Sequence, residues 1–253
     1  MNREQIKYIA IIAMTFNHAA HALMTPGTLL FETMENIGYI TAMVMAYFLV
    51  EGFHYTRSVR KYAVRLLIFA ALSQLPYMKS QGYEQLNMLF TVLIGLGILC
   101  AMQAEAGGNI ERSGSNTAGA VSPAGSIRWK IVCAGLILMS FVCDWGVLFP
   151  VTVMYLEKSR GDRQRQLRVY LIIAAVFVLL NTSTFYQEEG ALFAASLLRG
   201  AFSSIGILAA AALVLFVYNG QTEQKYRRFH KWFFYIYYPL HLAILWGIKV
   251  LLA

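Results

Sequence analysis

The chain has 253 residues, of which 58% are hydrophobic and only 13% are charged, and its mean hydropathy is +0.54. This composition excludes a soluble globular domain and indicates a protein with several membrane-spanning segments. The net charge of +8 would be typical of a nucleic-acid-binding protein if the chain were soluble. Basic loops on the cytoplasmic face of a membrane account for it instead, so we expect a lipid bilayer and no nucleic acid as partner.

Nine apolar runs, separated by short polar connections, predict an all-α bundle of about nine transmembrane segments. The runs cover residues 6–24, 37–55, 62–78, 88–104, 130–143, 146–156, 167–182, 191–218 and 232–252. The fifth and sixth runs are each shorter than the roughly 20 residues that a straight span requires. They predict either two short crossing helices or a re-entrant hairpin, which would leave seven spans plus the hairpin.

The positions of Lys and Arg predict the orientation of these segments. Basic residues gather in alternate connections, at 57–65, 112–130, 158–168 and 225–231, and Lys7 lies at the start of the first run. Because such residues are retained on the cytoplasmic side, the N-terminus is predicted in the cytoplasm and the C-terminus outside. We expect a single domain over 1–253, with a flexible cytoplasmic linker at about 105–127 where Gly, Ser and Ala are abundant.

The first run carries a basic residue near its start and a histidine well inside the apolar segment. Ten residues separate Lys7 from His18, which places the imidazole roughly 16 Å further along a helix, near the middle of a bilayer. An ionisable side chain at that depth faces the bundle interior or a water-filled cavity and marks a candidate functional site. A neutral imidazole there suits a general base, whereas a simple hydrogen bond to a neighbouring helix is the alternative interpretation.

The cytoplasmic end of the second run brings together Glu51, His54 and Arg57, and Arg60, Lys61 and Arg65 follow in the connection and the third run. These residues suit either a belt at the level of the lipid headgroups or the mouth of a site for an anionic cofactor. In the second case the guanidinium groups would bind its phosphates in bidentate fashion.

The last run contains Pro239 and, close behind it, His241 at about the same depth as His18. Two histidines at mid-membrane depth on separate helices favour a shared site, although a structural role for His241 in a proline-kinked helix stays open. Asp144, between the fifth and sixth runs, is expected away from the cytoplasmic face. The sequence contains no nucleophile elbow, P-loop, dinucleotide fingerprint or metal motif, so we expect neither covalent serine or cysteine catalysis nor a metal.

Several short motifs, in order and spacing over nearly the whole chain, resemble the TraX family. They are the run Ile6 to His18, the segment Phe48–Phe53 leading through His54 and Arg57 to Lys61-Tyr62, Asn87 with Phe90-Thr91, Asp144-Trp145-Gly146, and Tyr238-Pro239-Leu240-His241-Leu242. That family acetylates pilin and is similar to the transmembrane acyltransferase superfamily. Members of the superfamily move acyl groups, typically from cytoplasmic acetyl-CoA, to acceptors at or beyond the external face.

The resemblance implies an acetyltransferase in a bacterial cytoplasmic membrane, with acetyl-CoA as the acyl donor. His18 would be the base, assisted by His241 or Asp144, and the acceptor would be a peptide amine, a glycan or a small molecule. The expected donor-binding residues are Lys7, Glu51, His54, Arg57, Arg60, Lys61 and Arg65. Family members commonly carry Asp before the histidine, and Asn17 stands there instead.

Two other classes of function remain open from the sequence alone. A proton-coupled transporter of small molecules would also need mid-membrane histidines with an acidic partner. A non-catalytic membrane scaffold would need neither.

Overall fold

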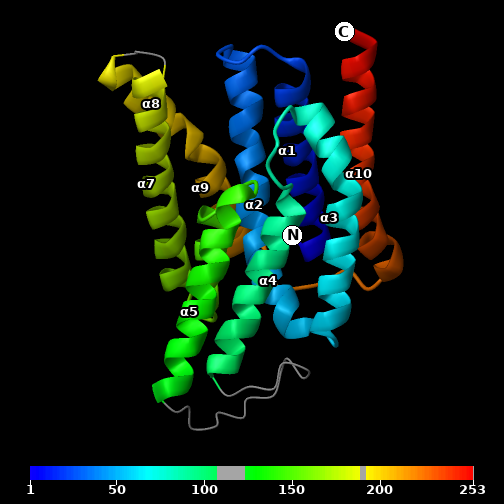
Figure 1. Ribbon diagram of the computed structural model, residues 1–253, viewed down its shortest axis with the longest axis vertical. Coiled ribbons are helices and arrows are strands. Elements are labelled where there is room, and N and C mark those ends of the chain that lie inside the picture. Colours follow the sequence, from blue (N-terminus) through cyan, green and yellow to red (C-terminus); the bar gives the residue numbers. More distant parts are fainter. Residues whose placement is uncertain (107–122, 189–191, 253) are drawn as a thin grey trace.

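The computed structural model describes residues 1–106, 123–188 and 192–252, and the described residues form helices and no β-strand, which confirms the predicted all-α class. Within these described ranges, ten α-helices form the bundle (Figure 1). They are α1 Arg3–Leu23, α2 Leu29–Tyr55, α3 Val59–Gln81, α4 Met88–Glu105, α5 Pro123–Met139, α6 Leu148–Lys158, α7 Arg163–Glu188, α8 Phe193–Ser203, α9 Ile205–Ala212 and α10 Arg227–Leu252. A π-helical turn, Leu213–Val217, continues α9.

Side chains at the helix ends explain where several helices begin and stop. Asn2 caps α1 through its side chain and forms a capping box with Gln5. Asn87 caps α4 by accepting the N–H of Leu89. Gly82 ends α3 in the left-handed conformation, with φ of 78°, which a residue with a Cβ adopts only at a steric cost.

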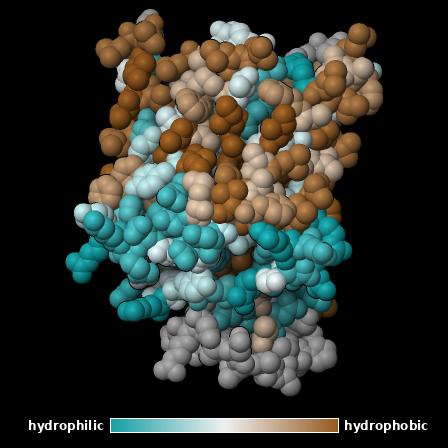
Figure 2. Space-filling view, turned by 180° about the vertical axis from the view of Figure 1, so that it is seen from behind, coloured by the Kyte–Doolittle hydropathy of each residue, from teal (hydrophilic) through white to brown (hydrophobic). Residues whose placement is uncertain are grey.

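The two ends of the bundle differ in charge. We call the end that carries the α2–α3, α6–α7 and π-turn–α10 connections the basic end, because Arg57, Arg60, Arg160, Arg163 and Lys225 lie there. Figure 2 shows a hydrophilic band over this lower part of the molecule and an apolar surface above it. The C-terminus of α10 lies at the opposite end (Figure 1). This division is the expected pattern for a multi-pass membrane protein.

Five helical segments in the described residues are long and apolar enough to cross a membrane. They are Leu29–Tyr55, Met88–Glu105, Arg163–Gln187, Phe193–Val217 and Arg228–Leu252. In the part of the chain that the structure describes, the nine predicted runs fall mainly on helices, but nine transmembrane segments are not confirmed. α3 carries several basic residues, and α6, with 11 residues, rises only about 16 Å, roughly half of a bilayer core. The run 191–218 is also interrupted, since α8, α9 and the π-turn share it.

The turn between α5 and α6 pairs with the connection between α3 and α4. The N–H of Leu86 donates to the carbonyl of Val142 at 2.9 Å, and the N–H of Asp144 donates to the carbonyl of Leu86 at 2.7 Å. Trp145 and Val147 have φ of 56° and 59°, an unfavourable region for side chains of this size, so the turn is held by its surroundings. This pairing places Asp144 at the start of α4.

Most of the predicted linker, residues 107–122, lies outside the described residues. Helix α5 begins at Pro123, so the last residues of the predicted linker lie in the first turn of this helix. Proline is favoured in the first turn of a helix, where its missing N–H costs no hydrogen bond.

Candidate active site

His18 and His241 form a buried pair near the middle of the bundle. The Nδ1 atom of His18 and the Nε2 atom of His241 are 2.7 Å apart, and the two rings are nearly parallel, with an interplanar angle of 12°. Only 6% of His18 and 5% of His241 is exposed. Helix α10 brings its histidine to α1 because it packs against both α1 and α3.

The hydrogen bonds of this pair fix the proton positions in its neutral form. The Nδ1 atom of His241 lies 2.9 Å from the carbonyl oxygen of Tyr237, which can only accept, so this nitrogen carries a proton. The Nε2 atom of His241 is then an acceptor, and the proton of the 2.7 Å bond belongs to Nδ1 of His18. The Nε2 atom of His18 therefore keeps its lone pair, and it has no hydrogen-bond partner among the described residues. His18 is arranged to accept a proton at this atom.

A cavity of about 640 Å³ lies on the side of His18 that faces the end opposite to the basic end, and we call it the outer cavity. His18, His21, Glu35 and Asp144 all line it, and neither Lys nor Arg occurs among the described residues of its wall. Glu35 contacts Nε2 of His21 at 3.2 Å. Asp144 is half-buried in the α5–α6 turn, outside the helices, and burial raises the pKa of its carboxyl to about 6.

A second cavity, of about 280 Å³, reaches into the bundle from the basic end, and we call it the inner cavity. Arg3, Lys7, Arg65 and Lys231 line its wall. The ammonium of Lys7 lies over the rings of Phe48 and Phe234, at 5.7 and 5.3 Å from their centroids. The Nε atom of Arg65 is buried without a hydrogen-bond partner in the described part of the chain, so the guanidinium has capacity for a ligand.

Only a thin layer of side chains separates the two cavities. On α2, Ala42 lines the outer cavity and Met45 the inner one. On α4, Met88 lines the outer cavity and Leu89 the inner one. On α10, Tyr238 lines the outer cavity and Tyr235 the inner one. Because residues three positions apart on a helix are separated by about 4.5 Å along its axis, the layer is less than one turn thick.

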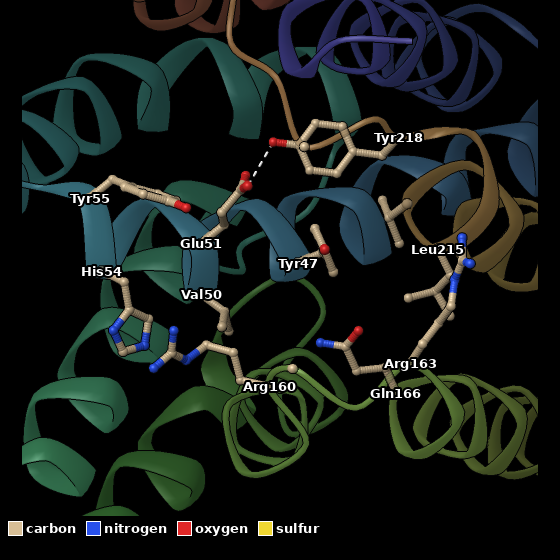
Figure 3. Close-up of a pocket in the computed structure, with 13 residues that line it drawn as sticks. Tyr47, Val50, Glu51, His54, Tyr55, Arg160, Arg163, Gln166, Leu215 and Tyr218 are labelled. Atoms are coloured by element: carbon tan, nitrogen blue, oxygen red, sulfur yellow. Dashed lines mark hydrogen bonds between the residues drawn. The ribbon is translucent and has the colours of Figure 1, made fainter. Parts of the chain in front are cut away.

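A further cavity at the basic end, of about 380 Å³, contains two of the predicted residues (Figure 3). Glu51 accepts hydrogen bonds from Arg3 at 2.7 Å and from the Tyr218 hydroxyl at 2.6 Å. His54 pairs with Glu157 at 2.8 Å. Figure 3 shows the side chains of Arg160 and Arg163 on different sides of this cavity. Glu51 and His54 thus form their ion pairs with residues outside the cavity lining, and the charged groups of the cavity do not converge on one point.

The structure therefore divides the predicted site residues into groups. Lys7 and Arg65 line the inner cavity, and His18 and Asp144 line the outer cavity. His241 does not line the outer cavity, but it contacts His18, which does. Glu51 and His54 lie in the third cavity, apart from the histidine pair. Arg57, Arg60 and Lys61 are exposed and line none of these three cavities.

Several site residues were not among those predicted, namely Glu35, Tyr83 and Tyr238, which all line the outer cavity. The Tyr83 hydroxyl contacts Nδ1 of His21 at 3.0 Å. Glu35 had a sequence signal, since Glu32 and Glu35 are the only charged residues in the connection between the first two apolar runs. Asn17, in place of the expected Asp, donates to the carbonyl of Glu35 at 3.1 Å and makes no hydrogen bond to His18.

Comparison with known proteins assigns a family to this arrangement. The family model described as "TraX protein" matches residues 2–249 of the chain. A relative from Dichelobacter nodosus, named "Probable fimbrial assembly protein FimC, serogroup H1", is 27% identical over 261 residues, which cover 98% of this chain and 96% of the relative. No solved structure matches the chain.

Proposed function

This chain belongs to the TraX family, and we propose that it is an integral-membrane acetyltransferase that moves an acetyl group from cytoplasmic acetyl-CoA to an acceptor at the external side. One observation carries the proposal. The unprotonated nitrogen of His18 lies at a thin layer between two cavities that open toward opposite ends of the bundle. Donor and acceptor can thus reach one base from the two faces of the membrane.

The basic end faces the cytoplasm, because Lys and Arg are retained there. Acetyl-CoA, the donor substrate, enters the inner cavity from this end. Arg3, Lys7 and Arg65 lie where its anionic and amide groups pass, and the exposed Arg57, Arg60 and Lys61 meet phosphates outside the mouth. The cavity volume of about 280 Å³ is at the lower limit for ligand pockets, which suits a slender pantetheine arm with its thioester foremost.

The reaction needs a single base. The acceptor nitrogen or oxygen attacks the thioester carbonyl carbon and loses a proton to Nε2 of His18. The carbon–sulfur bond then breaks, and the proton passes to the departing CoA thiolate. His241 acts as a positioning residue, since its Nε2 accepts from His18 and keeps the reactive nitrogen unprotonated. Burial of the pair limits the access of water, which would hydrolyse the thioester.

The outer cavity favours an amine over a hydroxyl as acceptor. Glu35 and Asp144 line its wall and no Lys or Arg does so among the described residues, which suits a ligand that arrives as an ammonium. A peptide amine agrees with the relative whose name refers to fimbrial assembly. The ammonium loses its first proton to water in the outer cavity and enters the dry layer as a neutral amine, so Nε2 of His18 is free to take the second proton, which is released in the attack.

The direct test is release of CoA thiol by the purified protein in nanodiscs supplied with acetyl-CoA and a peptide with a free amino terminus. We expect wild-type protein to release thiol and to acetylate the peptide, and His18→Ala to lose at least 100-fold in rate, since a general base contributes about 10²–10⁴-fold. Full activity of a folded His18→Ala variant would remove the proposed base.

Two cavities on either side of a thin layer also suit a proton-coupled transporter, which is the second candidate. Proteoliposomes distinguish the two functions. A transporter would carry a labelled amine across the membrane without any acetyl-CoA, and CoA thiol would not appear when donor and acceptor are mixed.

A further inference from the structure

The hydroxyl of Tyr238 is buried and has no hydrogen-bond partner in the described part of the structure. Tyr238 is only 5% exposed. Buried tyrosine hydroxyls almost always find a partner, because an unmatched polar group in a dry interior is unfavourable. A buried donor without an acceptor is thus a candidate for binding an oxygen atom that arrives with a substrate.

Tyr238 is placed beside the reacting groups. Its ring lies 6.2 Å from the ring of His18 and 5.5 Å from that of His241, measured between centroids. It also belongs to the layer between the cavities, since it lines the outer cavity while Tyr235, one turn earlier on α10, lines the inner cavity. A thioester that advances from the inner cavity toward His18 must therefore pass Tyr238.

A second donor faces the same point. Met88 is the first residue of α4, and its backbone amide faces the Tyr238 hydroxyl without reaching the geometry of a hydrogen bond. Asn87 satisfies the next two amides, since its side chain accepts from Leu89 and its carbonyl accepts from Phe90, both at 3.0 Å. The Met88 amide has no acceptor among the described residues. The start of an 18-residue helix also favours negative charge.

We propose that the Tyr238 hydroxyl and the Met88 N–H form the oxyanion-binding site of the acyl transfer. This assignment rests on the proposed acetyltransferase function and deepens it by naming a further catalytic residue. When the acceptor nitrogen forms its bond to the carbonyl carbon, the π electrons of the carbonyl move onto its oxygen, and the two donors bind that oxygen. When the carbonyl re-forms, the carbon–sulfur bond breaks, and the CoA thiolate takes the proton held by His18.

Three other tyrosines line the outer cavity, namely Tyr39, Tyr77 and Tyr83. Tyr83 contacts Nδ1 of His21, and among the described residues only Tyr238 has a tyrosine hydroxyl that is buried without a hydrogen-bond partner. The Met45 and Leu89 side chains lie on the inner side of the layer, so the donor has to displace them before its carbonyl reaches Tyr238. The Tyr238 hydroxyl is therefore buried in the free protein, and it becomes able to bind the carbonyl oxygen when the thioester displaces these two side chains.

The test compares Tyr238→Phe with Tyr170→Phe in the thiol-release assay. Tyr170 is a matched control, since it is also fully buried and its hydroxyl donates to the carbonyl of Met43 at 3.2 Å, away from the three cavities. We expect Tyr238→Phe to lower kcat by about 100-fold or more, as loss of one oxyanion donor does, while the KM for acetyl-CoA changes less than about threefold. Tyr170→Phe should keep its kcat within about threefold of wild type.

Melting temperatures of both variants show whether a loss is structural, because removal of one hydroxyl with the ring retained should leave the fold intact. If Tyr238→Phe keeps kcat while wild-type protein is active, the oxyanion assignment is wrong and the acetyltransferase proposal stands. If wild-type protein releases no thiol with any amine, the acetyltransferase proposal fails and this assignment falls with it.

Discussion

Nδ1 of His18 and Nε2 of His241 are 2.7 Å apart, although 222 residues lie between them in the chain. The contact joins the first helix to the last and sets the direction of a short proton chain, from His18 through His241 to the carbonyl of Tyr237. The other ring nitrogen of His18, Nε2, is unprotonated because of this chain.

The first prediction concerns the acceptor role of His241. In His241→Gln, Oε1 lies near the position of Nε2 and can still accept from His18, so we expect most of the activity to remain. In His241→Leu the proton on Nδ1 of His18 has no acceptor and the tautomer is no longer fixed, and kcat should fall about 10-fold or more. Equal activity of the two variants at equal melting temperature would contradict the positioning role.

The second prediction concerns donor binding. Lys7→Met and Arg65→Leu each remove a cation from the inner cavity, and the KM for acetyl-CoA should rise about 10-fold, since a charge-assisted hydrogen bond contributes about 1.5–3 kcal/mol. Arg168→Gln removes an equal charge from an exposed position at the same end and should leave KM unchanged. A general dependence on surface charge would instead raise KM in all three variants.

The third prediction concerns the acceptor. Glu35→Gln removes a carboxylate from the outer cavity and should raise the KM for an amine acceptor about 10-fold without changing the KM for acetyl-CoA. The control is Glu84→Gln, because Glu84 is exposed in the nearby α3–α4 connection and does not line the cavity. If both variants leave the acceptor KM unaltered, the carboxylates do not recognise an ammonium.

The fourth prediction concerns pH. The pKa of Asp144 is raised to about 6, so its carboxyl is neutral below that pH and charged above it. Attraction of an ammonium should therefore strengthen as pH rises through about 6, and the acceptor KM should fall between pH 5 and pH 7. The matching variant is Asp144→Asn, whose acceptor KM should lack this step. A step of equal size in the variant would assign it to another group.

The fifth prediction concerns helix packing. A Cβ atom at Gly206 would overlap the backbone carbonyl of Asn36 on α2, so Gly206→Ala should destabilise the protein by about 1–3 kcal/mol. At Gly247 on α10 an added Cβ meets nothing within 4 Å, and Gly247→Ala should leave the melting temperature unchanged or raise it slightly. Thermal unfolding in detergent, followed by circular dichroism, measures both. An equal effect at both positions would show that the close approach of α9 to α2 does not limit stability.

Much of the helical architecture was predictable, because long apolar runs must satisfy their backbone groups internally in a membrane. The boundaries of α2, α3 and α4 follow from Thr28, Ser58 and Asn87, which cap these helices through their side chains. The number of membrane-spanning helices was harder to predict from hydropathy. The helices α3 and α6 are partly shielded from lipid by the rest of the protein. Such helices need not be apolar or long enough to cross alone.

The depth of the two histidines in the membrane could be predicted from the sequence, but not which of the candidate residues share a cavity. Counting residues along a helix placed His18 and His241 at similar depths, because each residue rises by a fixed 1.5 Å, and that prediction needed no tertiary information. Which helices are neighbours, and which way each face turns, was decided only by packing. Glu51 and His54 were expected near the donor with Lys7, but both line another cavity, where Glu51 pairs with Arg3 and Tyr218 and His54 pairs with Glu157 on α6.

The sequence by itself thus determined the class, the family resemblance, the helical runs and the depth of the histidines. The tertiary structure decided that the two imidazoles meet, that Glu35 and Asp144 share a cavity with His18, and that Tyr238 is left with an unpaired hydroxyl beside the two histidines. The physical reason is that a helix in lipid is apolar on nearly every side, so its sequence does not specify which side meets a partner. Close packing at positions such as Gly206, and the hydrogen bonds of buried polar groups, make that choice.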